Sequence, residues 1–441
     1  MGSMNDIVAS SGLSSQAQAV LAFAGSVWLA VCVVLGTMVC RRVFGSGSQQ
    51  TKPSSTSSKS KRSAAPKADV VLESVQPVEQ TTIKPSLSKQ QKKALLAKSK
   101  HKPGGLSVES KAHPSCVNTL KGHGDRVTGL AFSADGKWLA SSCEDRVVRL
   151  FKVDDAAAKS IQTIRVNLER EPAVGVCFGS NSSEVVVATS GAVGGGSLSK
   201  YGVPNNPGKQ PEQAWEHKDI HGKNEVATMS TGRQGSEPPL LVTTCQRKTE
   251  VGVWYADTGR PIQMLDTNQL KNHMAAISPD GRFIAAAAFT SDVKIWEAKY
   301  GKGNNSGVSV AHVMNLKGHK GAVNWLCFDA EGTRAITASK DKTLMVWNLN
   351  VRYHLNEDPR VLKKLEVEQP YEMIAVSPDN VLAAVFGTTL IFQCLDSGEV
   401  LEKVENAHAS AVTALVWAPS QAGGFLATAS GASVRLWKSP K

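Results

Sequence analysis

The sequence predicts an all-β fold built from seven similar units, and two observations lead to this prediction. Short strand-like runs that end in an aromatic residue recur along residues 113–441, at spacings of 42 to 53 residues. The aromatic ends are Phe151, Tyr201, Trp254, Trp296, Trp347, Phe392 and Trp437. Within the units, apolar runs are joined by hairpin turns, as in "FSADGKWLAS" and "ISPDGRFIAA". This period is typical of the four-stranded blade of a β-propeller, so seven ends predict seven blades.

An apolar segment precedes the blades. After a short tail, residues 1–19, the 21 residues 20–40 are uncharged and predominantly apolar. At about 1.5 Å per residue they would span roughly 30 Å as a helix, the thickness of the hydrocarbon core. Arg41 and Arg42 follow at once, which predicts a single transmembrane helix with the rest of the chain in the cytosol. A cleaved signal peptide or a transit peptide fits less well, because the run is long, apolar on all sides and not preceded by a basic residue.

Residues 41–112 form a basic linker. They hold 15 Lys and Arg against four acidic residues, and they are rich in Ser, Gln and Pro. Such a segment buries too little apolar surface to offset the entropy of ordering, so we expect disorder. Beside a membrane helix its lysines could contact anionic lipid or RNA, although a solvated tether is equally consistent with the composition. The linker lacks aromatic residues among its lysines, which leaves sequence-specific RNA recognition unsupported.

The composition of residues 113–441 argues against two classes of function. Their net charge is close to zero, which argues against a nucleic-acid-binding surface on the propeller. The eight cysteines include no C-x-x-C pair and no metal-ligand spacing, so we expect reduced thiols and no cofactor. The sequence also shows no cluster of acids or nucleophiles, and we therefore expect no enzyme activity.

Polar residues recur at fixed places in the units. In "SKDKTLMVW" an aspartate stands at the start of a strand, where it costs stability unless a partner is near. His319 precedes Asp341 by 22 residues, and His123 precedes Asp145 by the same distance. A His–Ser–Asp set could indicate nucleophilic catalysis, but recurrence at the blade period together with a strand-end Trp favours a structural role.

These motifs resemble the WD40 family, in whose blades a His, a Ser or Thr, an Asp and a Trp form a hydrogen-bonded tetrad. The resemblance assigns His319, Ser339, Asp341 and Trp347 to one complete tetrad and His123 and Asp145 to a partial one. An imidazole between a carboxylate and a hydroxyl leaves no buried polar group without a partner. Other blades depart from the pattern, with Cys143 where the Ser is expected and Lys248 and Gly431 where the Asp is expected.

Residues 115–120 should close the ring. They have strand character and precede the first unit. Pairing them behind "SVRLW" as the outer strand of the last blade would remove an exposed sheet edge.

Residues 267–302 carry a more specific resemblance. The block "NQLKNHMAAISPDGRFIAAAAFTSDVKIWE" and the run "RVNLE" are similar to the transducin beta-like family of WD40 proteins, as is the order of span, basic linker and propeller. The resemblance implies an endoplasmic-reticulum membrane protein with a cytosolic propeller. The family is associated with the unfolded-protein response and with binding the membrane kinase that phosphorylates a translation initiation factor.

The fourth unit supplies a candidate partner patch, because it carries polar and aromatic residues that the fold alone does not explain. These are Asn268, Gln269, His273, Phe289 and Asp292. The alternative is that they replace the missing tetrad with local hydrogen bonds.

The expected function is that of a non-catalytic scaffold that docks proteins at the cytosolic face of the endoplasmic reticulum. The alternative is a membrane tether that binds RNA or anionic lipid through the basic linker. A plastid or mitochondrial outer membrane is the alternative location, since an apolar span followed by many lysines can also be routed there.

Overall fold

The computed structural model describes residues 113–440 except 155, 159, 192–194, 205–208, 234, 236, 246, 270–271, 302–306 and 420–423. The chain divides into two compact units, Met1–His101 and Lys102–Lys441, and the described residues all belong to the second. The predicted tail, the predicted transmembrane helix of residues 20–40 with its flank Arg41 and Arg42, and the basic linker lie outside the described residues. Among the residues that are described, no helix has the length and apolar character to cross a bilayer.

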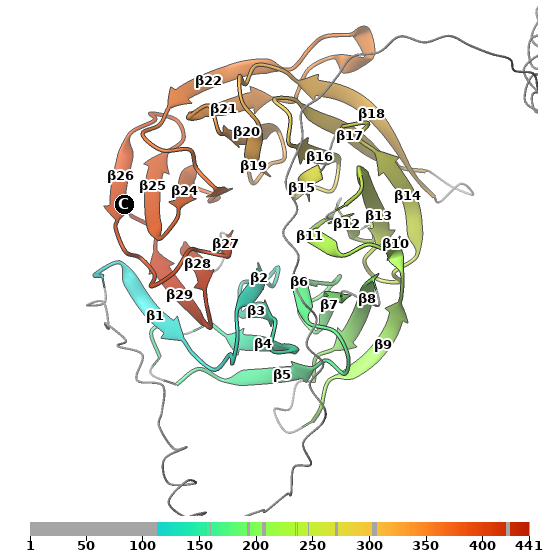
Figure 1. Cartoon of the computed structure of the whole chain (residues 1–441), viewed down its shortest axis with the longest axis vertical. Helices are drawn as coiled ribbons and strands as arrows, with labels where there is room; N and C mark the ends of the chain where they lie inside the picture. The colour runs from blue at the N-terminus through green and yellow to red at the C-terminus, as the bar shows by residue number, and fades with distance from the viewer. Residues whose placement is uncertain are drawn as a thin grey trace, which may run out of the picture. The chain divides into compact units, whose positions relative to one another are not determined.

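The described residues form seven four-stranded antiparallel sheets arranged in a ring (Figure 1). Blade one holds β2 (Val127–Phe132), β3 (Trp138–Cys143), β4 (Val147–Lys152) and β5 (Thr163–Asn167). Blade two holds β6 (Ala173–Phe178), β7 (Glu184–Gly191), β8 (Gly195–Gly202) and β9 (Glu212–His217). Blade three holds β11 (Val226–Gly232), β12 (Leu240–Cys245), β13 (Glu250–Tyr255) and β14 (Pro261–Asp266). The short strand β10 (Ile220–Lys223) connects blades two and three.

The remaining blades follow the same order from the inner to the outer strand. Blade four holds β15 (Asn272–Ile277), β16 (Phe283–Ala288), β17 (Val293–Tyr300) and β18 (Val308–Leu316). Blade five holds β19 (Val323–Phe328), β20 (Arg334–Ser339), β21 (Thr343–Asn348) and β22 (Arg360–Glu366), with the 3-10 helix η1 (Tyr353–Leu355) before its last strand. Blade six holds β23 (Met373–Val376), β24 (Val381–Phe386), β25 (Thr389–Cys394) and β26 (Val400–Val404). Blade seven holds β27 (Ala414–Trp417), β28 (Phe425–Ser430), β29 (Ser433–Lys438) and, from the start of the propeller, β1 (Cys116–Leu120).

The ring closes as predicted. Strand β1 pairs antiparallel with β29, and Leu120 lies opposite Val434 while Cys116 lies opposite Trp437. The last sheet is thus made from both ends of the propeller, which covers the edge that β29 would otherwise expose. The prediction of seven blades and of residues 115–120 as the closing strand is confirmed.

The hydrophobic core lies between the blades. Seven clusters of buried residues are present, and each combines side chains of two neighbouring sheets. The second strands are the most deeply buried, and all six residues of β16, "FIAAAA", are enclosed on both faces. Small side chains there let the twisted sheets approach closely while the larger side chains of the first and third strands fill the remaining space.

The turns between first and second strands repeat one solution. In blades one, four and five a glycine takes a left-handed conformation in this turn: Gly136 has φ +68°, Gly281 +73° and Gly332 +71°. Asn380 takes the same place in blade six with φ +59°. Glycine and asparagine tolerate this conformation best, so the D-G and D-N pairs that predicted the hairpins are explained by backbone geometry.

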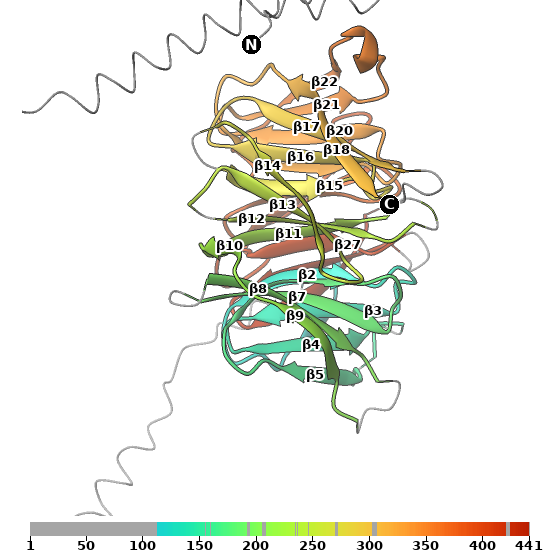
Figure 2. The same ribbon diagram turned by 90° about the vertical axis from the view of Figure 1, so that its right-hand side faces the viewer.

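Figure 2 shows the ring from its side, with the strands running between its two faces and the connecting loops gathered at both. Because antiparallel strands alternate in direction, the loops between second and third strands share one face with the connections between blades. We call this the tetrad face, since His319 and Asp341 both lie in such loops. The connections between third and fourth strands, including η1, lie at the other face.

Candidate interaction site

The polar network of blade five differs in one residue from the predicted tetrad. His319 lies with Nδ1 3.3 Å from Asp341 Oδ2, as expected. Its Nε2, however, is 2.7 Å from the hydroxyl of Thr337, and the indole N–H of Trp347 donates to the same hydroxyl at 2.9 Å. Thr337, not Ser339, is therefore the hydroxyl that joins the histidine to the tryptophan.

Ser339 has another task at the end of β20. Its hydroxyl lies 3.0 Å from the carbonyl oxygens of Gly321 and Ala322, and it accepts the backbone N–H of Asp341 at 3.2 Å. Thr337 and Ser339 are two residues apart on the same face of the strand, so the sequence pattern fits both. The imidazole reaches the inner of the two positions because the Trp347 ring lies there.

The same hydroxyl position is used in three other blades. In blade three Thr243 accepts the indole N–H of Trp254 and lies 2.9 Å from His221 Nε2. In blade seven Thr428 does the same for Trp437 and His408. In blade one the position is filled by Ser141, 2.6 Å from His123 Nε2, so the expectation that Cys143 replaces the hydroxyl is wrong for the same reason as at Ser339.

Burial keeps these histidines neutral. It lowers the pKa of His123 and His221 to about 4 and of His408 to about 3, and it also lowers the pKa of His319. Burial alone would raise the pKa of Asp341, but hydrogen bonds from the Thr343 hydroxyl and the Lys320 N–H lower it to about 2. With Ser339 turned away from His319, blade five has a structural network and not the geometry of a nucleophile and its base.

His221 was not found by sequence reasoning. It lies on the extra strand β10, 22 residues before Thr243, and no aspartate follows at the usual place in its blade. The only signal available was the pairing of a histidine with a later Trp254 at roughly blade spacing.

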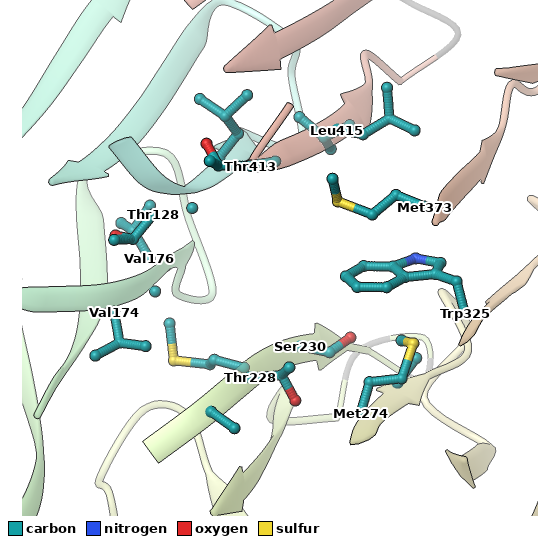
Figure 3. Close-up of a pocket in the computed structure, with 18 of the residues that line it drawn as sticks. Thr128, Val174, Val176, Thr228, Ser230, Met274, Trp325, Met373, Thr413 and Leu415 are labelled. Carbon is teal, nitrogen blue, oxygen red and sulfur yellow. The ribbon is translucent and has the colours of Figure 1, made fainter. Parts of the chain in front are cut away.

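A cavity of about 910 Å³ occupies the centre of the ring, lined by the first strands of all seven blades (Figure 3). Apolar side chains dominate in the close-up: Val174, Val176, Met274, Trp325, Met373 and Leu415. Hydroxyl groups of Thr128, Thr228, Ser230 and Thr413 lie among them. The charged side chains that contribute to the lining are Arg126, Glu144 and Glu225. The cavity is within the size range of small-ligand and peptide side-chain pockets.

Three members of the candidate partner patch are engaged in local bonds. The Asn268 N–H donates to Asp266 at 2.8 Å, and Asn268 has a left-handed φ of +49°. The Gln269 side chain donates to the carbonyl of Asp292 at 3.3 Å, and the Ser291 hydroxyl donates to the Asp292 carboxylate at 3.1 Å. These contacts join the loop before blade four to its β16–β17 hairpin, in keeping with the alternative that local bonds replace a tetrad.

The other two members form an aromatic contact at the tetrad face. The His273 and Phe289 rings meet edge to face with centroids 5.4 Å apart, and His273 also lines the central cavity. The Lys340 ammonium of the neighbouring blade lies 5.6 Å from the centroid of the Phe289 ring. Phe289 is 44 % exposed. We call His273, Phe289 and Lys340 the rim cluster.

Sequence reasoning missed Lys340 and the apolar lining of the cavity. Lys340 belongs to blade five and meets Phe289 only because the ring places the two hairpins side by side. Trp325 and Met373 stand in first strands, where a large apolar residue is indistinguishable by sequence from a core residue.

Metal-ligand types meet at one place within the described part of the chain. The ligand atoms of His123, Cys143 and Asp145 lie within 4.8 Å of one another. The six cysteines described by the structure are all free.

Comparison with known proteins supports the assignment of the repeats. The family model "WD domain, G-beta repeat" matches residues 114–152, 311–348 and 399–438. These ranges end with the third strands of blades one, five and seven, three of the four blades in which a histidine meets a buried hydroxyl.

Several curated proteins are similar to the chain over longer stretches. Transducin beta-like protein 2 of Mus musculus is 29% identical over 358 residues, which cover 80% of this chain and 78% of that protein. The Homo sapiens protein of the same name is 28% identical over 330 residues, 74% of this chain and 72% of that protein. The target of rapamycin complex subunit wat1 of Schizosaccharomyces pombe is 29% identical over 188 residues, 41% of this chain and 54% of that protein. The chain therefore carries WD40 repeats in a seven-bladed propeller and is similar along most of its length to transducin beta-like protein 2.

Proposed function

We propose that this protein is a non-catalytic scaffold, anchored in the endoplasmic-reticulum membrane, that docks protein partners on the tetrad face of its propeller. WD40 propellers generally bind proteins, and none of the relatives named above carries the name of an enzyme. A rigid ring whose core lies between all neighbouring blades holds its loops in fixed positions, which lowers the ordering cost of binding.

The observation that carries this proposal is the rim cluster beside the central cavity. Phe289 offers an exposed aromatic side chain, Lys340 a cation, and the apolar lining behind His273 a concave surface. Aromatic and cationic anchors next to a desolvated pocket are typical of the residues that dominate binding energy in protein interfaces.

Recovery of partners by the full-length protein tests the docking face. We expect the double variant Phe289→Ala/Lys340→Ala to lose at least about tenfold of partner recovery, the effect of removing one hot spot. The matched control is Leu355→Ala, which removes an equally exposed apolar side chain, 64 % accessible, from the other face. Equal recovery with the double variant and the wild type would reject the tetrad face.

The membrane anchor is proposed from the sequence. Its support is the apolar run of residues 20–40, the Arg41–Arg42 flank and the similarity to transducin beta-like protein 2. We expect the protein to remain with endoplasmic-reticulum membranes after alkaline extraction and to leave them when residues 20–40 are deleted. Release of the full-length protein by simple lysis would overturn the anchor, and sorting to plastids or mitochondria would overturn the location.

A partner in translation control follows from the resemblance stated for residues 267–302. The proposed partner is the membrane kinase that phosphorylates a translation initiation factor during the unfolded-protein response. Co-precipitation of that kinase from stressed cells, lost in the Phe289→Ala/Lys340→Ala variant, is the expected result.

The basic linker supports a second candidate function. Fifteen Lys and Arg in residues 41–112 favour electrostatic binding of RNA or anionic lipid. Binding of full-length protein to RNA would then fall steeply with salt, and vesicles of anionic lipid would compete for it. Salt-independent binding would exclude this mode.

A further inference from the structure

Blades one and five share one backbone geometry around their histidines. Each has a three-residue hairpin loop between its second and third strands, and the last loop residue is left-handed, Arg146 with φ +62° and Lys342 with φ +61°. The two imidazoles also lie similarly over the strand-end rings, with centroids 6.4 Å from Phe151 and 6.5 Å from Trp347. The side chains around them differ at four places: Ser141 for Thr337, Cys143 for Ser339, Val147 for Thr343, and Phe151 for Trp347.

In blade five the hydrogen bonds fix the proton on Nδ1 of His319. The indole of Trp347 can only donate, so the Thr337 hydroxyl accepts from it and has its own proton available for Nε2. Nδ1–H then faces the Thr343 hydroxyl at 3.0 Å and the Asp341 carboxylate at 3.3 Å. Both ring nitrogens are satisfied.

In blade one the proton takes the other nitrogen. Phe151 has no N–H, and the Ser141 hydroxyl points to the carbonyl of Arg149 at 3.4 Å, so Ser141 accepts from Nε2–H of His123 at 2.6 Å. Nδ1 keeps a bare lone pair. Val147 offers it no hydroxyl, and Nδ1 has no hydrogen-bond partner although the side chain is only 1% exposed.

Two more lone-pair donors face this nitrogen. Asp145 Oδ2 lies 3.6 Å from Nδ1, and the buried Cys143 thiol belongs to the same group of ligand atoms within 4.8 Å. A bare imidazole nitrogen opposite a carboxylate with no proton between them is unfavourable, and a cation between them would satisfy both.

We propose that His123, Cys143 and Asp145 form a binding site for a divalent metal ion of the zinc type. Nitrogen, sulfur and oxygen are the donors that zinc takes in proteins, at about 2.0–2.3 Å. Tetrahedral ligands at those bond lengths stand roughly 3.3–3.7 Å apart, and the 3.6 Å between Nδ1 and Oδ2 matches.

The surroundings suit such a site in two respects. The Nε2–H···Ser141 bond orients the imidazole, and the Gly124 N–H donates to Asp145 Oδ2 at 2.8 Å, as outer groups do around metal ligands. The positive charge of Arg149 lies close to His123 and opposes a cation, so the carboxylate and the thiolate are both needed to neutralise the metal.

The test uses the full-length protein in detergent, titrated with Zn²⁺ and, as a spectroscopic probe, with Co²⁺ alone. We expect one metal per chain and a thiolate-to-cobalt charge-transfer absorption. Cys143→Ser should abolish that absorption and weaken Zn²⁺ binding at least about a hundredfold. The matched control is Cys245→Ser, which changes the buried thiol at the corresponding strand end of blade three, where no carboxylate joins it; binding should be unchanged.

A variant that removes no ligand sharpens the test. Val147→Thr supplies the hydroxyl that blade five has and should weaken Zn²⁺ binding about tenfold by giving Nδ1–H an alternative partner. Far-ultraviolet circular dichroism confirms that each variant is folded, and Asp145→Asn replaces Cys143→Ser if the latter is not. The proposal is overturned if the folded wild type binds no Co²⁺, or if the absorption survives in Cys143→Ser or disappears in Cys245→Ser.

Discussion

Blades four and five are neighbours with the same four-stranded architecture and opposite internal chemistry. Blade five joins His319, Thr337 and Trp347 through buried hydrogen bonds, whereas blade four has Ala286 at the position of Thr337. Trp296 of blade four instead packs against the His312 ring at 5.8 Å, and its sheet pairs as regularly as that of blade five. Burial of apolar side chains between the sheets is therefore sufficient to form a blade, and the polar network adds to a sheet that packing already defines.

The largest expected effect sharpens this comparison at the two tryptophans. Trp347→Ala removes a ring that is 1% exposed and should cost about 3–5 kcal/mol of unfolding free energy. Trp296→Ala, 5% exposed in the wild type, should cost about 1–2 kcal/mol less, because it leaves no buried hydroxyl and imidazole behind. Denaturant unfolding of the full-length protein measures both. Equal losses would show that the network contributes nothing.

The next effect separates the two hydroxyls of β20. Thr337→Val keeps the shape of the side chain but leaves the Trp347 N–H and His319 Nε2 unpaired, so we expect a loss of about 2–3 kcal/mol. Ser339→Ala removes bonds to two loop carbonyls and should cost about 1 kcal/mol. The same unfolding measurement decides between them, and a larger loss for Ser339→Ala would restore Ser339 as the central hydroxyl.

Acid should act through the neutral histidines. The folded-state pKa of His408 is about 3 and that of His221 about 4, both below the ordinary 6.5 of an unfolded chain. Their contribution to stability is complete above pH 6.5 and is lost as the pH falls from 6.5 toward these values, because the unfolded chain then binds more protons. The expected slope is about 1.4 kcal/mol per pH unit for each histidine.

Changing His408 tests this assignment of the slope. His408→Gln should unfold more easily at pH 7, yet its stability should fall less steeply between pH 6.5 and 5, by one proton. Unfolding midpoints across that range supply the slope, and parallel curves for variant and wild type would contradict the assignment.

The smallest effect concerns the contact between the two blades at the rim. Lys340→Ala removes a cation from the exposed Phe289 ring, an interaction of about 0.5 kcal/mol at such sites. We expect a stability change of that size alone, measured by denaturant unfolding. A loss of several kcal/mol would mean that Lys340 holds blades four and five together, and its use in the docking test would then be invalid.

The propeller could be predicted because its signals are local. Each aromatic strand end and each turn such as "PDG" lies within one unit, and repetition multiplies a weak signal seven times. Closure by residues 115–120 followed from the same count, since a strand left over at the start matches an edge left over at the end.

The details of the networks could not be predicted in the same way. Thr337 and Ser339 both face the same side of β20, and only the position of the Trp347 ring decides which one the imidazole reaches. The candidate partner patch divided for a similar reason: Gln269 and Asp292 turned to local bonds, while Phe289 met Lys340 of another blade.

The sequence by itself determined the number of blades, the strand that closes the ring and the positions of the tryptophans, because periodic burial of apolar side chains specifies a repeated sheet. Only the tertiary structure decided where hydrogen-bond donors and acceptors meet. Replacing Trp347 by Phe151 and Thr343 by Val147 looks conservative in one dimension, yet it reverses the proton on the imidazole and leaves His123 facing Asp145 and Cys143. The direction of a buried hydrogen bond depends on all its neighbours in space, and these come from strands that the chain places far apart.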